Sequence, residues 1–227
     1  EGDELGWVTT TMGDEDIMLS TQHAKTLRFK QAQVRPMGRP ASGVRGINLR
    51  EGDVVVSMDV VSTAEKDTAQ LVTISRSGKG KRTPVKLYRA KGRGTQGMAT
   101  MGLVENDVIA TACVINADMV LTFITSNGIV LKTQASDVRV CKRSAQGVRV
   151  LSLNEKDSVV AMVADEPEDE DEKRKRILDI GDMVGVDLVE QRLGQVVGQQ
   201  QAPELQQRRC VGHRLTRQVN ADEVAHR

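Results

Sequence analysis

The feature that most constrains the fold of this chain is an internal repeat with a period of about 50 residues. When the units are aligned on three arginines, 54 and 50 residues apart, no gap is needed inside any unit. The aligned positions are arginine at the anchor (Arg39, Arg93, Arg143), glycine four residues later (Gly43, Gly97, Gly147) and aspartate fourteen residues later (Asp53, Asp107, Asp157). Arrays of this kind bury the apolar face of each unit only against its neighbours. We therefore expect a repeat architecture.

Each unit contains short β-branched runs between polar turns, which is typical of strands. The first runs are residues 16–21, 71–75 and 119–125, and a tight turn follows each at Ala24, Gly78 or Asn127-Gly128. The Asn-Gly pair favours a two-residue hairpin turn, whereas a left-handed backbone at Ala24 would cost about 1 kcal/mol. A returning strand, a loop, a short strand (residues 44–49, 98–103 and 148–153) and a last apolar strand complete each unit. About four strands per unit predict the blades of an all-β, propeller-like array.

The repeat also predicts the domain boundaries. Three blades are expected at residues 13–61, 62–115 and 116–164. Because Asp3 lies 50 positions before Asp53 in similar surroundings, residues 1–12 are interpreted as the end of a truncated fourth blade. Beyond Val163 the composition changes, since residues 165–172 are acidic apart from one proline and residues 191–207 are rich in glutamine. Such segments cannot pack a core, so residues 165–227 are expected to form a disordered tail, acidic and then Gln-rich.

The charge and the cysteine content limit the classes of function that this chain can have. Residues 1–164 contain 22 Lys and Arg against 17 Asp and Glu, whereas the remainder contains 10 against 14. A basic body with an acidic tail indicates an anionic partner and a competitor for the same surface. The three widely spaced cysteines (Cys113, Cys141, Cys210) form no disulfide framework or zinc knuckle, which fits a reducing cytoplasm. With no signal peptide and no apolar run near the ~20 residues of a membrane span, we expect a soluble protein without a membrane partner.

The repeated cations are the strongest functional signal. They form three rows: a first cation row eleven residues before the anchor (Arg28, Arg82, Lys132), a second four residues before it (Arg35, Arg89, Arg139), and a third made of the anchors themselves (Arg39, Arg93, Arg143). Arg45 and Arg149 follow the first and third repeated glycines. Guanidinium groups suit bidentate phosphate contact, so evenly spaced rows predict binding to the backbone of a duplex with little base reading.

Two other interpretations of these residues remain open. The cations could lie on a solvated face, or pair with Asp53, Asp107 and Asp157 inside each unit. The glycines (Gly43, Gly97, Gly147) most readily satisfy a turn or bulge, and close approach of a phosphate is compatible with that role. No catalytic or metal-binding constellation is found, because His23 falls in a hairpin turn and His213 and His226 lie in the tail. We expect no catalytic residue, no metal, no cofactor and no small-molecule substrate for this chain.

In these same residues the chain resembles the C-terminal domain of the A subunit of bacterial DNA gyrase. The matching stretches are Leu27-Arg-Phe-Lys, Gln33-Val-Arg-Pro-Met-Gly-Arg and Gly43-Val-Arg-Gly-Ile in the first unit, Gly80-Lys-Arg-Thr-Pro-Val and Gly92-Arg-Gly-Thr-Gln-Gly in the second, and Gly128-Ile-Val-Leu-Lys-Thr and Arg143-Ser-Ala-Gln-Gly-Val in the third. The likeness covers about residues 1–165. It implies a β-pinwheel whose basic rim wraps double-stranded DNA, with three blades and the end of a fourth present here.

The resemblance further implies a place in a bacterial, nucleoid-associated, cytoplasmic type II topoisomerase that introduces negative supercoils. Its remaining parts, which are the rest of the gyrase A subunit together with the B subunit, would supply the cleavage tyrosine and the ATP and Mg chemistry. The family's gyrase box, Gln-Arg-Arg-Gly-Gly-Lys-Gly, is absent, with degenerate counterparts at residues 38–43, 92–97 and 142–147. The alternative within the family is the C-terminal domain of the corresponding topoisomerase IV subunit, which guides DNA segments. The alternative of another class is a propeller-like protein-interaction scaffold.

Overall fold

The computed structural model describes residues 4–167, which lie within one compact unit, and the description below refers to them. The predicted tail, residues 165–227, lies outside the described residues from residue 168 onward. No helix among the described residues is long and apolar enough to cross a membrane.

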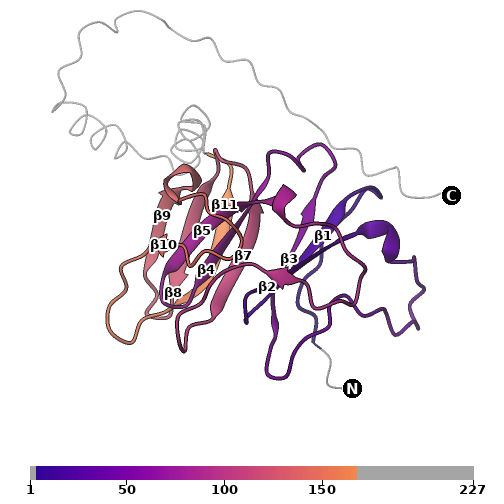
Figure 1. Ribbon diagram of the computed structural model, residues 1–227, viewed down its shortest axis with the longest axis horizontal. Coiled ribbons are helices and arrows are strands. Elements are labelled where there is room, and N and C mark those ends of the chain that lie inside the picture. The colour runs from indigo at the N-terminus through magenta and orange to yellow at the C-terminus, as the bar shows by residue number, and fades with distance from the viewer. Residues whose placement is uncertain (1–3, 168–227) are drawn as a thin grey trace, which may run out of the picture. The chain divides into compact units, whose positions relative to one another are not determined.

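Three antiparallel sheets, one for each repeat, make up the described part of the chain (Figure 1). The first sheet contains β1 (Asp16–Thr21), β2 (Lys25–Lys30) and β3 (Val55–Val61); the second contains β4 (Gln70–Ser75), β5 (Lys79–Pro84) and β7 (Ile109–Ile115); and the third contains β8 (Val120–Thr125), β9 (Val130–Gln134) and β11 (Val159–Asp165). A short 3-10 turn follows the second strand of each sheet, at η1 (Gln31–Gln33), η2 (Val85–Leu87) and η3 (Ala135–Asp137). The predicted all-β repeat array is confirmed.

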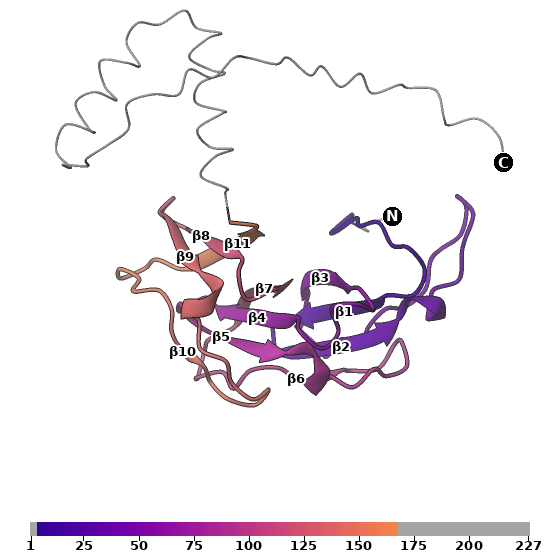
Figure 2. The same cartoon turned by 90° about the horizontal axis from the view of Figure 1, so that it is seen from above.

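Each of the last two repeats donates a short strand to the sheet of the repeat before it. The short strand β6 (Met98–Ala99) of the second repeat pairs with β2 of the first, and β10 (Val148–Arg149) of the third repeat pairs with β5 of the second. The first sheet therefore has the order β3-β1-β2-β6 and the second the order β10-β5-β4-β7, as Figure 2 shows, while the third has three strands within residues 4–167. This differs from the expectation that each repeat builds four strands of its own, and residues 44–49 form no strand.

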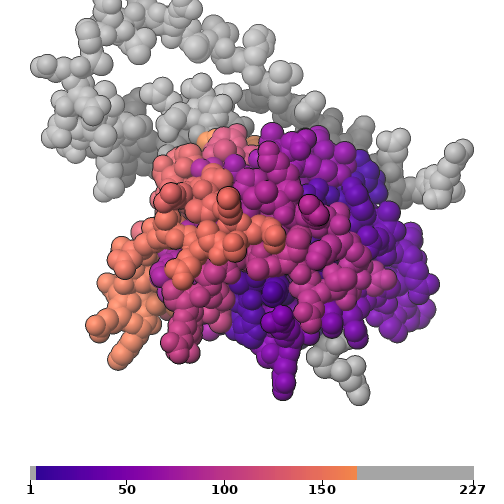
Figure 3. All heavy atoms as spheres, in the orientation of Figure 1, coloured from indigo at the N-terminus to yellow at the C-terminus, as the bar shows by residue number. Residues whose placement is uncertain are grey.

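The core lies between the sheets. Met18 and Val61 of the first repeat pack with Leu71 and Tyr88 of the second in one cluster of fully buried side chains. A second cluster joins Val72 and Ile74 of the second repeat to Leu121 and Phe123 of the third. In the space-filling view the orange loop of the third repeat lies directly against the magenta and purple surface of the second (Figure 3). Each repeat thus buries its apolar surface against the next one, as the array argument requires.

The hairpin turns share one geometry. The third residue of each turn has a left-handed backbone, with φ of 56° at Ala24, 80° at Gly78 and 78° at Gly128. At the last turn, the amide of Gly128 donates to Thr125 O and the amide of Thr125 donates to Ile129 O. Residues 126–128 therefore form a three-residue turn, in which a single left-handed residue suffices. The two-residue turn expected from Asn127-Gly128 is wrong for this reason.

The repeated aspartates cap these turns. Asp53 accepts hydrogen bonds from Thr21 Oγ1 at 2.7 Å and from the amide of His23 at 2.9 Å. Asp107 binds the hydroxyl and amide of Ser77 in the same way, and Asp157 binds the corresponding turn of the third repeat. Their carboxylates thus serve the hairpins. None of the three pairs with a cation of the three rows within the described residues.

Candidate nucleic-acid interface

The first cation row lies mostly inside the protein. The side chain of Arg28 is buried, pairs with Asp16 at 2.6 Å, and donates from Nη1 to the carbonyl oxygens of Val85 and Tyr88 in the next repeat. Arg82 is buried in the same way. Because their donors are engaged by carbonyl groups of a neighbouring blade, these two arginines fasten one blade to the next, and little of either guanidinium faces solvent.

Arg82 donates from Nε to Val138 O at 2.6 Å and from Nη2 to Ser136 O at 2.9 Å. Its amide and carbonyl also bind the third repeat, through Arg139 O and the amide of Cys141. Lys132 occupies the equivalent position in the third repeat and is exposed on β9. The first cation row therefore contains two buried arginines that contact the next blade and one exposed lysine.

The second cation row is the exposed one. Arg35, Arg89 and Arg139 all follow the 3-10 turns, and all three side chains are exposed. Within residues 4–167 none of them forms an ion pair or a side-chain hydrogen bond. Each presents a free guanidinium at the same place in its blade, which is the geometry that repeated phosphate contact needs.

The third cation row changes its role along the chain. Arg39 is exposed, but Arg93 donates to the carbonyl oxygens of Gln33 and Arg45 in the preceding repeat, at 3.2 Å and 2.6 Å. Arg143 donates to Ala99 O at 3.1 Å, and its guanidinium lies 5.9 Å from the centroid of the Tyr88 ring. Both half-buried arginines therefore hold the loop between blades while part of each guanidinium stays accessible. Arg45 and Arg149, the other two predicted cations, are exposed.

The repeated glycines belong to the strand exchange. All three have a left-handed backbone, with φ of 78° at Gly43, 74° at Gly97 and 81° at Gly147. A side chain at Gly97 would place its Cβ 2.7 Å from Thr26 O, and one at Gly147 would meet Gly80 O. Both oxygens belong to strands that receive β6 and β10. Gly97 and Gly147 thus let a loop approach the backbone of the preceding blade, whereas nothing lies within 4 Å of the corresponding point at Gly43.

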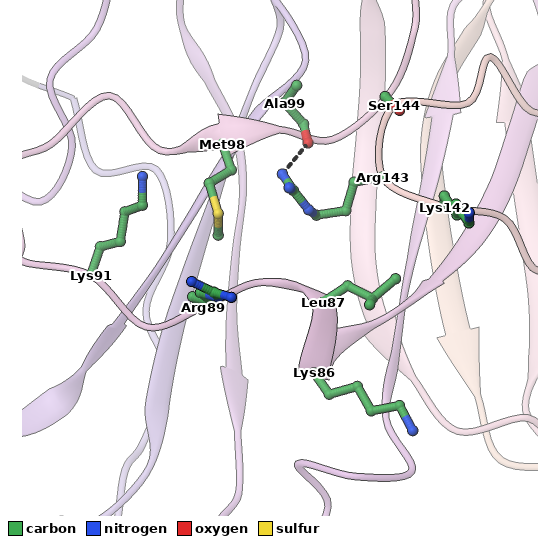
Figure 4. A pocket seen from close by; sticks show the side chains of 9 residues that line it. All are labelled: Lys86, Leu87, Arg89, Lys91, Met98, Ala99, Lys142, Arg143 and Ser144. Carbon is green, nitrogen blue, oxygen red and sulfur yellow. Dashed lines mark hydrogen bonds between the residues drawn. The ribbon is translucent and has the colours of Figure 1, made fainter.

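A cationic pocket of about 880 Å³ opens between the second and third repeats. Five of its lining residues are basic: Lys86, Arg89, Lys91, Lys142 and Arg143. The other lining residues are apolar or carry a hydroxyl group, and none carries a carboxylate. Figure 4 shows Met98 and Arg89 facing one another across the space, with Leu87 beside them and Arg143 extended toward Ala99. Apolar side chains interspersed with guanidinium and ammonium groups suit an anion that also carries apolar surface.

Sequence reasoning missed the three lysines of this pocket. Lys86, Lys91 and Lys142 have no basic counterparts at the aligned positions of the other repeats, so a search for repeated cations passes over them. A count of lysines near the second cation row would have found them, because Lys86 and Lys91 flank Arg89 closely in the sequence. Within residues 4–167, no group of His, Cys, Asp and Glu side chains is arranged to hold a metal ion.

Lys81 is the one lysine with a fully buried side chain in the described part of the chain. Its Nζ donates to the carbonyl oxygens of Lys142 and Arg143, at 2.6 Å and 2.5 Å. Burial lowers the pKa of this ammonium from its usual value to about 8, and the nearby Arg143 acts in the same direction. The backbone that carries two of the pocket's cations is thus bound to a buried ammonium.

Comparison with known proteins gives a consistent result. The model of the family described as "DNA gyrase C-terminal domain, beta-propeller" matches residues 15–62, 69–116 and 120–164, one segment for each repeat. The A subunit of DNA gyrase from Staphylococcus aureus strain MRSA252 is 39% identical over 176 residues, which is 77% of this chain and 20% of that protein. The same protein from strain NCTC 8325 is 39% identical over 173 residues. The chain therefore spans about a fifth of the length of these curated relatives.

Two solved structures are similar in fold. The C-terminal domain of DNA topoisomerase IV aligns with a TM-score of 0.65 at 24% identity, over 74% of this chain and 51% of that one. The E. coli ParC C-terminal domain aligns with a TM-score of 0.52 at 20% identity, over 69% of this chain and 64% of the other. At these identities the likeness concerns the fold of the blades.

Proposed function

Because this chain belongs to the DNA gyrase C-terminal domain family, we propose that it binds duplex DNA along the phosphate backbone and bends it around the blades. In this function the chain carries no chemistry of its own. It holds a DNA segment for a type II topoisomerase whose cleavage tyrosine and ATP-dependent, Mg-dependent steps reside in other parts of the enzyme.

The observation that carries this proposal is the second cation row. Arg35, Arg89 and Arg139 are exposed and unpaired within the described residues, and each lies at the same point of its blade. Contacts that recur at equal steps fit a ligand that itself has a regular repeat of charge, as the phosphates of a duplex do. The cationic pocket beside Arg89 adds further positive charge to the same loops.

Energetics require several such contacts. Bending a duplex smoothly by 40–90° over 20–30 base pairs costs on the order of 1–6 kcal/mol, which phosphate contacts must offset. Arg28 and Arg82 are left out of the proposed interface because they are buried and bound to carbonyl groups. The accessible charge of the proposed interface comes from the exposed second row together with Arg39, Arg45, Arg149 and the pocket cations.

The proposed context is DNA gyrase, with the rest of its A subunit, together with the B subunit, as partners in the bacterial cytoplasm near the nucleoid. The 39% identity to the gyrase A subunit supports this assignment, and the topoisomerase IV subunit is the alternative within the family. A protein-interaction scaffold is less favoured, because an acidic protein partner offers no reason for one guanidinium position to stay free in all three blades.

The test is a DNA-binding titration with the full 227-residue chain. Replacing Arg35, Arg89 and Arg139 together by Ala should weaken binding to a short linear duplex for every sequence tried, because backbone contacts carry no base information. The dependence of log K on log salt should flatten by about 2.7, from roughly 0.9 for each of the three phosphates that the variant no longer binds. Fluorescence anisotropy at several salt concentrations measures both effects.

A matched control removes the same charge from the other end of the strands. All three control residues are exposed: Arg76 lies in the hairpin turn that Asp107 caps, and Arg50 and Lys156 lie just before Asp53 and Asp157. Lys156 has a left-handed backbone that glycine tolerates. The variant R50A/R76A/K156G should retain most of the affinity. Equal decreases in affinity for the two triple variants would indicate nonspecific charge attraction, and absence of duplex binding by the unaltered chain at low salt would remove the DNA proposal.

A further inference from the structure

Lys81 is a departure from the repeat. The aligned positions are Leu27 in the first repeat and Leu131 in the third, and Leu27 is fully buried on β2 as Lys81 is on β5. A leucine satisfies such a position by packing alone, whereas a buried ammonium needs hydrogen-bond acceptors to replace its water. Lysine at this one blade therefore has to be explained by what its Nζ contacts.

The contacts of Nζ are backbone carbonyls of the next repeat. Nζ donates to Lys142 O and Arg143 O, and Lys81 forms no ion pair with a carboxylate among the residues that the structure describes. The amide of Cys141 and the carbonyl of Arg139 are bound to the backbone of Arg82 next to it. The loop that carries Lys142 and Arg143 is thus held on β5 at several consecutive points, and Lys81 holds the part whose side chains line the pocket.

We propose that Lys81 is a positioning residue for DNA binding, whose protonated ammonium keeps the Lys142–Arg143 loop in its phosphate-binding conformation, so that duplex affinity depends on this one proton. This inference rests on the proposed function and adds regulation of the same site by pH. A charged donor binds a carbonyl oxygen about twice as strongly as a neutral one. The neutral amine keeps two N–H groups, enough for both carbonyl oxygens, so what deprotonation removes is the charge that strengthens these two bonds.

The surroundings of Lys81 place this change in an accessible pH range. Burial lowers its pKa to about 8, with Arg143 lowering it further and the thiol of Cys141 acting in the opposite direction. Tyr88, over whose ring the Arg143 guanidinium lies, has its own pKa raised by burial. Because the thiol of Cys141 acts on the Lys81 ammonium, Cys141 needs its own control.

Loss of the Lys81 proton affects the stability of the fold in the opposite direction to DNA affinity. Since the pKa of Lys81 is lower in the folded chain than in the unfolded one, the unfolded chain holds more protons between the two values, and the free energy of unfolding rises with pH there. Deprotonation of Lys81 by itself therefore cannot unfold the chain and in that way cause a loss of DNA affinity. A role confined to stability would leave affinity unchanged or improved.

The experiment measures duplex affinity of the full chain at constant ionic strength from about pH 6.5 to about pH 9.5, the interval around the lowered lysine value. We expect Kd to rise roughly three- to tenfold with a midpoint near pH 8, as charge-assisted bonds to the loop are lost. Lys81→Met should bind more weakly at neutral pH and lose the step. Lys81→Leu, which copies Leu27, repeats the test in a side chain that this fold already accepts, and Cys141→Ser should keep the step.

A second readout does not involve DNA. In nitrogen-edited NMR spectra of the free chain, the amide of Ser144 should shift with the same midpoint in the unaltered protein and remain still in Lys81→Met. A flat affinity profile, or a step that survives in both Lys81 variants, overturns the inference and leaves the DNA proposal standing. An unaltered chain that binds no duplex at any pH overturns the proposed function, and this inference with it.

Discussion

The Nε atom of Arg82 donates a hydrogen bond to the carbonyl oxygen of Val138 at 2.6 Å, and this contact joins the second repeat to the third. Arg28 makes the equivalent contact from the first repeat to Val85 and Tyr88 of the second. A basic side chain in the middle of a returning strand thus binds the 3-10 turn of the following blade. The cation recurs at this position because the joint between blades recurs.

Replacing Arg82 by Met should destabilise the array. The change removes two charge-assisted hydrogen bonds and leaves the carbonyl groups of Ser136 and Val138 without these donors, which corresponds to about 2–4 kcal/mol of unfolding free energy. Denaturant unfolding followed by circular dichroism measures the change. The matched control is Lys132→Met, because Lys132 occupies the same aligned position but is exposed, and it should change stability little. Similar destabilisation in both variants would contradict the inter-blade role.

Gly97→Ala should cost more stability than Gly43→Ala. Both glycines have a left-handed backbone, so each substitution carries about 1–2 kcal/mol of strain. Only at Gly97 does the new Cβ also meet a backbone, 2.7 Å from Thr26 O, while nothing lies within 4 Å of the corresponding point at Gly43. Thermal unfolding of the two variants compares them directly. If Gly43→Ala proved the more harmful of the two, packing against β2 could not be the reason for the repeated glycine.

Asp59→Asn should stabilise the protein near neutral pH. Burial raises the pKa of the Asp59 carboxyl, whose Oδ1 accepts from the amide of Val114 and whose Oδ2 has no hydrogen-bond partner among the described residues. Because the folded chain holds this proton more tightly than the unfolded chain, its contribution to stability is present at acid pH and declines as pH rises through the raised pKa. The asparagine keeps the Oδ1 acceptor and removes that decline.

Melting temperatures recorded from acid to neutral pH test this directly. The variant should melt higher than the unaltered chain at neutral pH, and its stability should depend less on pH across the acid range. Asp67→Asn is the control, since Asp67 is exposed and should leave the profile unchanged. A lower melting temperature for Asp59→Asn at neutral pH would mean that the charged carboxylate supports the fold.

The pocket lysines should contribute to DNA binding although they do not repeat. Replacing Lys86, Lys91 and Lys142 together by Ala removes three of the five pocket cations without touching an inter-blade side-chain contact. We expect weaker duplex binding and a salt dependence flatter by as much as about 2.7, if each lysine contacts one phosphate. The same anisotropy titration measures it. An unchanged salt dependence would exclude the pocket from the interface and leave the second cation row as the contact surface.

Much of the fold could be predicted from local sequence signals. The runs at 16–21, 71–75 and 119–125 form strands within a residue of the expected ends, and the left-handed residue falls at Ala24, Gly78 and Gly128 as their alignment implied. These features depend on interactions between residues close in sequence, which the pattern of apolar, polar and glycine positions records.

Partnership between blades could not be predicted in the same way. The alignment of the repeats identifies Arg28 and Arg35 in the same way, yet Arg28 is buried against the next repeat and Arg35 is exposed. The difference depends on where the neighbouring blade lies, which a single-unit pattern does not contain. For the same reason, the alignment revealed β6 and β10 as short extended segments but assigned them to their own repeats, whereas they complete the sheets of the preceding ones.

The exchange of β6 and β10 means that the boundary of a repeat in the gene differs from the boundary of a blade in space. Excising residues 116–164 as a cassette would delete β10 along with the third sheet, so the second sheet would lose its fourth strand although every codon of its own unit remained. Recombination can therefore shorten or lengthen such an array only where the cut falls after the donated strand. Each sheet then still receives its fourth strand from the repeat that follows it.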